Sequence, residues 1–189
     1  MTQKKSILLQ FWLPLVILLL VILGALLFIK HQIPNTTLNN QHVHIGDQVT
    51  DFSLKQFNFE KKSHFFSELK AKVALINFFA SWCESCMLEI PALIKLRSLY
   101  QNKGFELILV NLDEKPEAVL PKFINNFEIN FPIYIDTTGK LGVFFNVQAI
   151  PTTVILDKNR KILLLETGDR NWESVKTRVF LEKALSFAN

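Results

Sequence analysis

The most prominent feature of the hydrophobic pattern is an apolar run near the N-terminus. Residues 7–29 (ILLQFWLPLVILLLVILGALLFI) contain no charged side chain and a single amide, Gln10. A helix of this length spans roughly 30 Å at about 1.5 Å per residue, which matches the hydrocarbon core of a membrane. A cleaved signal peptide is the alternative, but its apolar region is only about 7–15 residues long and ends in a small-x-small site. The pattern favours an uncleaved transmembrane signal anchor over residues 7–29.

The segments that flank this run predict its orientation. Lys4 and Lys5 precede the run, whereas only Lys30 follows it closely. Positive side chains favour the cytoplasmic side, so we expect residues 1–6 in the cytoplasm and the remainder outside, on the periplasmic face of the inner (cytoplasmic) membrane. Residues 30–45 are polar and aperiodic, which is typical of a tether. Residues 46–189 are then one extracytoplasmic domain.

Beyond residue 46, short apolar runs alternate with segments of helical periodicity. Residues 73–79 (VALINFF) and 105–110 (FELILV) are typical of strands buried on both faces of a sheet. The predicted strands cover 51–54, 57–59, 73–79, 105–110, 131–135, 152–156 and 162–165, and the predicted helices cover 83–102, 117–126, 139–145 and 173–187. The first two strands form an N-terminal hairpin. The order predicts an α/β fold, with a mixed central sheet and helices on both faces.

Charge narrows the range of partners. The chain has 21 basic and 17 acidic residues, and every acidic residue lies at or beyond Asp47. The part beyond residue 30 therefore carries a net charge of only +1, with no basic stripe and no run of like charges. This distribution argues against nucleic acid as a partner.

The chain has two cysteines, Cys83 and Cys86, in the stretch NFFASWCESCMLEIP. A structural zinc site would need about four cysteine or histidine ligands. The histidines, at positions 31, 42, 44 and 64, all precede the pair and do not complete such a set. Two buried structural cysteines are the other alternative. A redox pair fits best, because Cys83 falls where a buried strand ends and a helix begins, and a helix N-terminus stabilises a thiolate.

Together with its surroundings, this stretch resembles a known family. WCESC, preceded by LINFFAS and followed by MLEIP, is similar to the active site of the TlpA/ResA-like membrane-anchored thiol–disulfide oxidoreductases, which have a thioredoxin fold. The resemblance covers residues 46–185 and includes GDQVTDFSL, LVNLDE and AIPTTVILD. It implies that Cys83 is the nucleophile and Cys86 the resolving cysteine. It also implies that Pro151 follows a cis peptide bond, with the Ile150 backbone turned toward the substrate cysteine.

Other residues of the motif receive roles through their position. Glu89 matches a family glutamate near the buried cysteine, where burial would raise its pKa and let it pass protons; a solvated helix glutamate is the alternative. Trp82 either forms an apolar wall for substrate or is part of the core. Glu84 and Ser85 lie between the cysteines and help to tune the redox potential; many family members have proline in place of Ser85. Asn77 stands where thioredoxin has a buried acid.

The resemblance implies a reductant of protein disulfides, with protein thiols and disulfides as substrates. Electrons would come from a membrane thiol-reductant donor, and targets would include apocytochrome c during cytochrome c maturation. No cofactor is implied beyond the Cys83–Cys86 disulfide, and no metal. A disulfide oxidase or isomerase is the main alternative. A copper-binding assembly factor fits less well, because such proteins use C-x-x-x-C and a distant C-terminal histidine, and no histidine follows His64.

Overall fold

The computed structural model describes residues 14, 16–25, 43–57 and 63–187 of the chain. The chain divides into two units, Met1–Gln41 and His42–Asn189, which are described separately. In the first unit, residues 16–25 are helical. Within the described ranges, no helix combines the length and the apolar character needed to cross a membrane. Much of the predicted anchor (7–13, 15 and 26–29) and the predicted tether up to residue 42 lie outside the described residues.

The second unit is built on a seven-stranded mixed sheet with the order β2-β1-β5-β4-β3-β6-β7. The three central strands β3, β4 and β5 are parallel, whereas the other neighbouring pairs are antiparallel. The strands are β1 Ser53–Gln56, β2 Ser63–Phe65, β3 Val73–Phe79, β4 Phe105–Asn111, β5 Ile133–Ile135, β6 Thr152–Asp157 and β7 Ile162–Thr167. The helices are α2 Glu84–Tyr100, α3 Pro116–Asn126, α4 Lys140–Phe144 and α5 Val175–Phe187, with short 3-10 turns η1 Phe66–Glu68 and η2 Gln101–Lys103.

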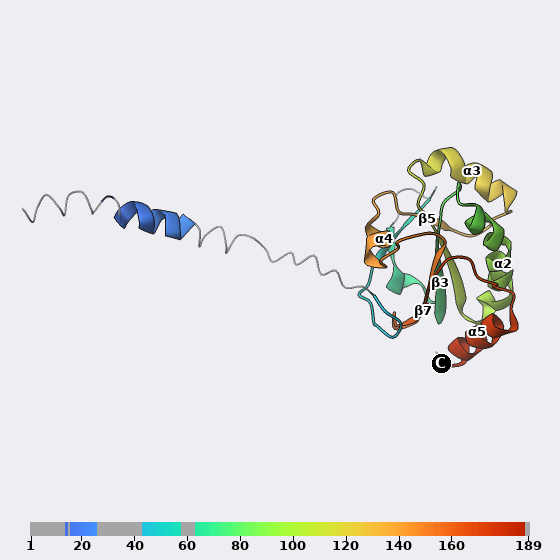
Figure 1. Ribbon diagram of the computed structural model, residues 1–189. Helices are drawn as coiled ribbons and strands as arrows, with labels where there is room; N and C mark the ends of the chain where they lie inside the picture. The colour runs from blue at the N-terminus through green and yellow to red at the C-terminus, as the bar shows by residue number, and fades with distance from the viewer. Residues whose placement is uncertain (1–13, 15, 26–42, 58–62, 188–189) are drawn as a thin grey trace, which may run out of the picture. The chain divides into compact units, whose positions relative to one another are not determined.

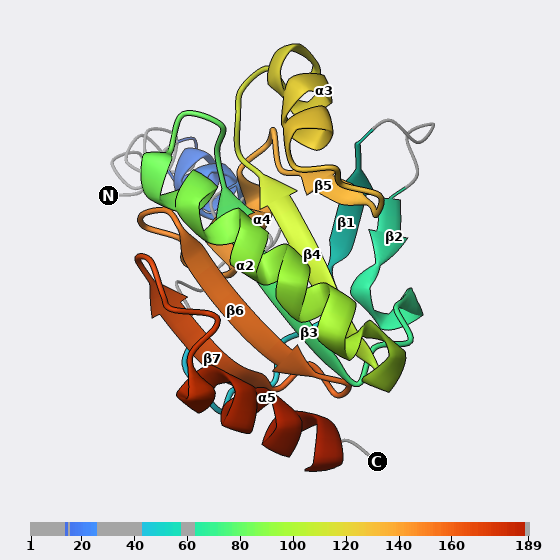
Figure 2. The same ribbon diagram turned by 90° about the vertical axis from the view of Figure 1, so that its right-hand side faces the viewer.

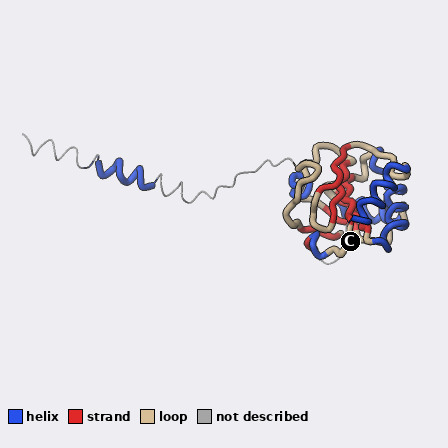
Figure 3. The backbone as a smooth tube through the Cα atoms, turned by 90° about the horizontal axis from the view of Figure 1, so that it is seen from below, coloured by secondary structure: helices blue, strands red, loops and turns tan. Residues whose placement is uncertain are grey.

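Side-chain alternation along the strands creates a hydrophobic core on each face of the sheet. In β3, Val73, Leu75 and Phe79 join a cluster that contains buried apolar side chains of α2, α3 and α5. The intervening side chains of β3 face a second cluster, which includes Leu141 of α4. Figure 1 shows α2 and α5 on one side of the strands and α4 on the other, Figure 2 shows α2 running across the sheet, and Figure 3 shows the strands as the middle layer. The predicted mixed sheet with helices on both faces is confirmed.

The predicted element boundaries hold closely, with one exception in the hairpin. Strand β3 has the predicted bounds, and α2 begins one residue after the predicted start and continues through Pro91. Of the return strand predicted at 57–59, residues 58 and 59 lie outside the described residues; the prediction was wrong for Phe57, because the strand that pairs with β1 lies at 63–65. Phe57 instead continues from β1: its side chain is buried in the α2-side cluster and its backbone N–H donates to the Ile133 carbonyl over 2.8 Å. An apolar residue at the end of one strand was mistaken for the start of the next.

Candidate active site

The end of β3 delivers the cysteine pair to the first turn of α2. Cys83 is the N-cap residue of the helix, and it forms a disulfide with Cys86, with 5.3 Å between the Cα atoms. The Cys86 backbone N–H donates to Cys83 Sγ over 3.2 Å. Cys83 is 7% exposed, whereas Cys86 is fully buried. The two sulfurs are therefore unequal, and Cys83 is the one that a second molecule can approach.

The surroundings of Cys83 favour a negative charge on its sulfur. The helix N-terminus presents unpaired backbone N–H groups and the positive end of the macrodipole. The Ser85 hydroxyl lies 3.5 Å from Cys83 Sγ, so it can donate to the sulfur, while Glu84 is exposed. When the disulfide is reduced, these donors stabilise a Cys83 thiolate, which is the attacking species in disulfide exchange.

Glu89 lies one helical turn beyond Cys86 and is 5% exposed. Its Oε1 accepts a hydrogen bond from Asn77 Nδ2 over 2.7 Å, and its Oε2 accepts one from Trp172 Nε1 over 2.8 Å. Burial raises the pKa of the Glu89 carboxyl above its ordinary value, while the two hydrogen bonds act in the opposite direction. The interpretation of Glu89 as a solvated helix glutamate is thereby excluded.

Asn77 fixes the sheet side of this cluster. It is fully buried in the middle of β3, opposite Thr153 of β6. Its Nδ2 donates to the Thr153 hydroxyl over 3.0 Å as well as to Glu89, whereas its Oδ1 has no hydrogen-bond partner within the described part of the chain. The amide is thus oriented as a donor toward the carboxylate.

A second buried carboxylate holds the turn that precedes Cys83. Asp113, just beyond the end of β4, is 6% exposed. It accepts hydrogen bonds from the backbone N–H of Ser81 over 2.9 Å and from the Ser81 hydroxyl over 3.0 Å. Asn111 Nδ2 donates to the same carboxylate over 2.6 Å. Because β3 and β4 are parallel neighbours, their carboxyl ends meet, and Asp113 ties the residues between β3 and α2 in place.

The residues predicted to contact substrate lie near the same end of the central strands as the cysteine pair. The Ile150–Pro151 peptide bond is cis, and Thr152 of β6 lies opposite Phe78 of β3. Ile150 packs against the hydrophobic cluster that contains both cysteines. Trp82 is 74% exposed, so its interpretation as a core residue is wrong and its side chain is free to meet another molecule.

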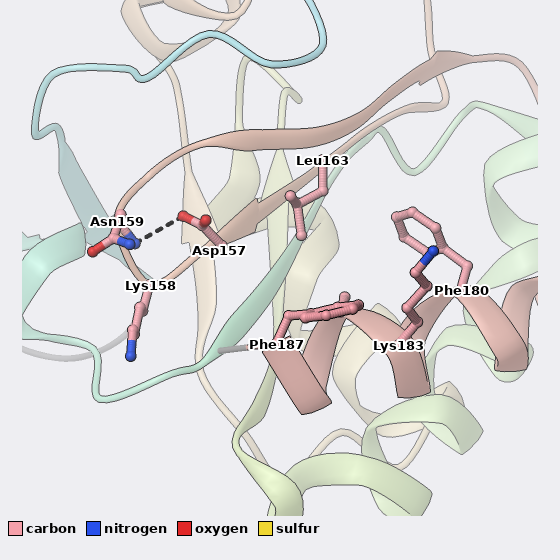
Figure 4. Close-up of a pocket in the computed structure, with 8 residues that line it drawn as sticks. Asp157, Lys158, Asn159, Leu163, Phe180, Lys183 and Phe187 are labelled. Atoms are coloured by element: carbon pink, nitrogen blue, oxygen red, sulfur yellow. Dashed lines mark hydrogen bonds between the residues drawn. The ribbon is translucent and has the colours of Figure 1, made fainter. Parts of the chain in front are cut away.

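A cleft of about 240 Å³ borders this site. It lies between α2 and the loop that joins β7 to α5, and is lined by Ser85, Leu88, Glu89, Ala92, Asp169, Arg170, Asn171, Trp172 and Glu173. A different pocket, of about 320 Å³, lies between the β6–β7 turn and α5 (Figure 4). It is lined by apolar side chains such as Phe180 and by two lysines. Asp157 and Asn159 also line it, and the Asn159 backbone N–H donates to Asp157 Oδ1. This second pocket is at the end of β6 away from Pro151 and contains none of the predicted site residues.

Sequence reasoning missed Trp172 and Asp113. Asp113 could have been found, because it lies shortly after the predicted strand 105–110, and a strand–helix–strand order favours a parallel neighbour for the strand before Cys83. Trp172 lies in a polar loop (GDRNW) more than 80 positions from Glu89, and no local pattern indicates the contact. In the described residues, no group of three or more His, Cys, Asp or Glu side chains is arranged to hold a metal ion.

A thioredoxin-type sheet with a closed C-x-x-C disulfide at a helix N-terminus defines the class of thiol–disulfide exchange proteins. The Redoxin family model matches residues 44–183. The thiol-disulfide oxidoreductase ResA of Geobacillus thermodenitrificans is 31% identical over 160 residues, which cover 85% of this chain and 89% of that protein. The thioredoxin-like protein YneN of Bacillus subtilis is 35% identical over 139 residues, which cover 72% and 79% of the two chains.

Solved structures agree with these relatives. The crystal structure of a putative thiol:disulfide interchange protein DsbE from Chlorobium tepidum superposes with a TM-score of 0.67 and 28% identity, over 76% of this chain and 99% of that one. The chain belongs to the Redoxin family and is a thiol–disulfide oxidoreductase of the ResA/DsbE type, with Cys83 and Cys86 as its C-x-x-C pair.

Proposed function

We propose that this protein is a membrane-tethered, extracytoplasmic reductant of protein disulfides. One observation carries the proposal: the Cys83–Cys86 disulfide joins a sulfur at a helix N-terminus, within reach of a partner, to a sulfur that is fully buried. Such asymmetry suits a two-step exchange, in which one thiol attacks outward and the other closes the cycle from within.

In the first step, the Cys83 thiolate attacks one sulfur of a target disulfide. A mixed disulfide forms, and the other target sulfur leaves as a thiolate. In the second step, Cys86 loses its proton and attacks Cys83 Sγ, so that the second target thiolate leaves and the Cys83–Cys86 bond closes. Two electrons pass from the dithiol to the target, and a dithiol donor must return them to restore the reduced protein.

Glu89 is the proposed proton acceptor for Cys86. The two residues are three positions apart on one helix, which places them on the same face, and both are buried. A buried thiol cannot lose its proton directly to water, so a nearby base is needed. A carboxyl whose pKa is raised by burial can hold the proton and release it later.

The target polypeptide is proposed to lie along the edge formed by Ile150, Pro151 and Trp82. The Ile150 backbone would pair with the residues around the target cysteine, as an added strand does, and the exposed Trp82 ring would cover the reacting sulfurs. Ser85 is proposed to tune the redox potential through its hydroxyl near Cys83 Sγ, together with the neighbouring Glu84.

The remaining parts of the proposal rest on the sequence. Residues 7–29 would anchor the protein, residues 1–6 would stay in the cytoplasm, and the domain from residue 46 would lie on the periplasmic side of the inner membrane. A membrane thiol reductant would supply electrons, and apocytochrome c with its C-x-x-C-H site is a candidate target. Protease treatment of intact spheroplasts should digest the domain; protection of the domain in that assay would contradict the orientation.

A trapping experiment tests the exchange itself. In the full-length Cys86→Ala variant, the mixed disulfide on Cys83 cannot be resolved, so target proteins should accumulate as complexes that reducing agent releases. The matched Cys83→Ala variant should trap none, because Cys86 is buried. Equal trapping by both variants, or none by either, would contradict the assignment of nucleophile and resolving thiol.

A disulfide oxidase or isomerase would use the same geometry in the opposite direction. The two are separated by the reduction potential of the Cys83–Cys86 pair, measured on the full chain in detergent against glutathione. A potential well above about −180 mV, the range of isomerases and oxidants, would overturn the reductase assignment. Copper-binding assembly would instead be indicated by tight Cu(I) binding to the reduced chain.

A further inference from the structure

Trp172 contacts the Glu89 carboxylate, and it has no role in the proposed reaction steps. It lies in the loop between β7 and α5, and its side chain is only 1% exposed. A buried indole N–H needs a hydrogen-bond acceptor, and its acceptor here is Oε2 of Glu89. Trp172 therefore links the loop to the carboxylate that follows Cys86 on α2.

Glu89 is held between two side-chain donors from different elements. Asn77 of β3 donates to Oε1, and Trp172 donates to Oε2, so that each carboxylate oxygen accepts a side-chain N–H. Both donors are neutral groups that keep their protons across the physiological range. Hydrogen bonds of this kind favour the carboxylate over the neutral acid, and they fix the plane of the group relative to the helix.

We propose that Trp172 is a positioning residue that keeps Glu89 ionised and oriented to accept the Cys86 proton when the mixed disulfide is resolved. The inference rests on the proton step of the proposed function. It adds a residue outside the C-x-x-C helix to that step, and it places part of the proton machinery on the β7–α5 loop.

The loop that carries Trp172 is itself fixed to the substrate edge. The backbone N–H of Gly168 donates to the Pro151 carbonyl over 2.8 Å. The Arg170 guanidinium lies 5.2 Å from the centre of the Trp172 ring, and the same side chain pairs with Glu166 of β7. The segment that positions Glu89 thus also contacts the proline beside which a target would bind.

The charged groups around Glu89 come mainly from this loop. Asp169 raises the pKa of the Glu89 carboxyl further, beyond the effect of burial, and the Arg170 backbone donates to it. Glu173 lines the same cleft and is paired with Lys95 of α2. On the sheet side, the neutral side chain of Asn77 donates both to Glu89 and to the Thr153 hydroxyl. If the Trp172 N–H is lost, burial and the negative charge of Asp169 still raise the pKa of Glu89, and one donor fewer opposes them.

The test follows the two chemical steps separately in the full-length protein. Reduced protein reacts with 5,5′-dithiobis(2-nitrobenzoate), so that attack by Cys83 releases one coloured thiolate and resolution by Cys86 releases a second. The rate of the second release should rise with pH as Glu89 ionises. In Trp172→Phe, this rise should move to higher pH. At a pH where the rate of the second release is still rising in the unmodified protein, that release should be about tenfold slower in the variant. The rate of the first release should be unchanged.

Two further variants separate positioning from packing. Incorporation of 3-benzothienylalanine at position 172 keeps the ring shape but lacks the N–H, and it should reproduce the effect of Trp172→Phe. Phe145→Leu removes packing from the buried cluster on the opposite face of the sheet and should leave the pH profile in place.

The outcomes distinguish the two proposals. If Glu89→Gln abolishes the rise with pH but both changes at position 172 leave it unmoved, the role of Trp172 is wrong and the proton step stands. If Glu89→Gln leaves the rise unmoved, the proton step itself fails, and the inference fails with it.

Discussion

Two buried carboxylates flank the active-site turn, and they differ in what they bind rather than in how deeply they lie. Glu89 is 5% exposed and Asp113 is 6% exposed. Glu89 accepts hydrogen bonds from the side chains of Asn77 and Trp172. Asp113 accepts one from the backbone N–H of Ser81 and others from the Ser81 hydroxyl and the Asn111 side-chain amide. Burial alone therefore does not identify a proton carrier.

The donors explain the different roles. One of the donors to Asp113 is the backbone N–H of Ser81, two residues before Cys83, so this carboxylate shapes the turn. The bonds to Glu89 come from side chains and hold a buried carboxyl one helical turn from the buried Cys86. One carboxylate determines geometry and the other is available for chemistry. The predictions below change one of them at a time.

The largest effect is expected from Glu89→Gln. The amide keeps the shape of the side chain but cannot take up the Cys86 proton, so the second thiolate release should slow about a hundredfold. Stopped-flow absorbance measures this rate, and the first release should stay close to that of the unmodified protein. Glu173→Gln, which alters an exposed carboxylate of the same cleft, is the matched control. An equal slowing in both variants would show that cleft charge, rather than Glu89, matters.

Asp113→Asn should act on stability. One oxygen acceptor is replaced by an NH2 group that faces donors, so a buried N–H or O–H loses its partner and the free energy of unfolding should fall by about 2 kcal/mol. Denaturant titration of the full chain in detergent gives this value. Asp136→Asn, which alters a buried carboxylate just after β5 that accepts from the backbone N–H of Gly142 in α4, should lower stability without changing either thiolate release, whereas Asp113→Asn should also slow the first release. If Asp113→Asn left the rate of the first release unchanged, the Asp113 carboxylate would not position the turn before Cys83.

The pH dependence of stability should also report on the Glu89 carboxyl. Burial raises the folded-state pKa of Glu89 above its ordinary value of 4.5. The folded state therefore binds this proton more tightly than the unfolded state does, and the resulting stabilisation is fully present below pH 4.5 and is lost as pH rises through the raised pKa. Each unit between the two values corresponds to about 1.4 kcal/mol.

The measurement compares the unmodified protein with Glu89→Gln across that window. The difference in unfolding free energy should shift in favour of the variant as pH rises, because only the unmodified protein must then bury a charge. Glu106, whose pKa is also raised by burial, contributes equally to both proteins and cancels. A difference that stays constant with pH would mean that Glu89 has the same pKa folded and unfolded.

The sequence predicted most of the fold because its strands and helices have strong local patterns. The run at 73–79 is apolar on both faces, which is the signature of a central parallel strand, and its bounds were correct. The return strand of the hairpin was misplaced, since β2 is a three-residue edge strand with a weak pattern. Placement of Phe57 depended on a contact with Ile133, which no local pattern contains.

The residues of the candidate site also differ in whether a local pattern predicts them. Cys83, Cys86 and Pro151 were predicted because they lie in short motifs, and Asp113 could have been inferred from strand adjacency. The partner of Glu89 could not, since Trp172 reaches it from a loop 83 positions away in the chain. The sequence therefore identified the C-x-x-C pair but not the donors that hold the Glu89 carboxylate.

The smallest effect is expected at Ser81, and it tests whether Asp113 acts through backbone or side chain. Ser81→Ala removes the hydroxyl bond of 3.0 Å but leaves the backbone N–H bond of 2.9 Å, so unfolding should become easier by about 1 kcal/mol. Ser98→Ala, which removes an exposed hydroxyl bond to a backbone carbonyl of α2, should change stability by less than about 0.5 kcal/mol. If Ser81→Ala matched Asp113→Asn in size, the hydroxyl would be the main contact, and the turn would be fixed by a side chain. A loss no larger than that of Ser98→Ala would instead leave the backbone N–H as the contact through which Asp113 positions Cys83.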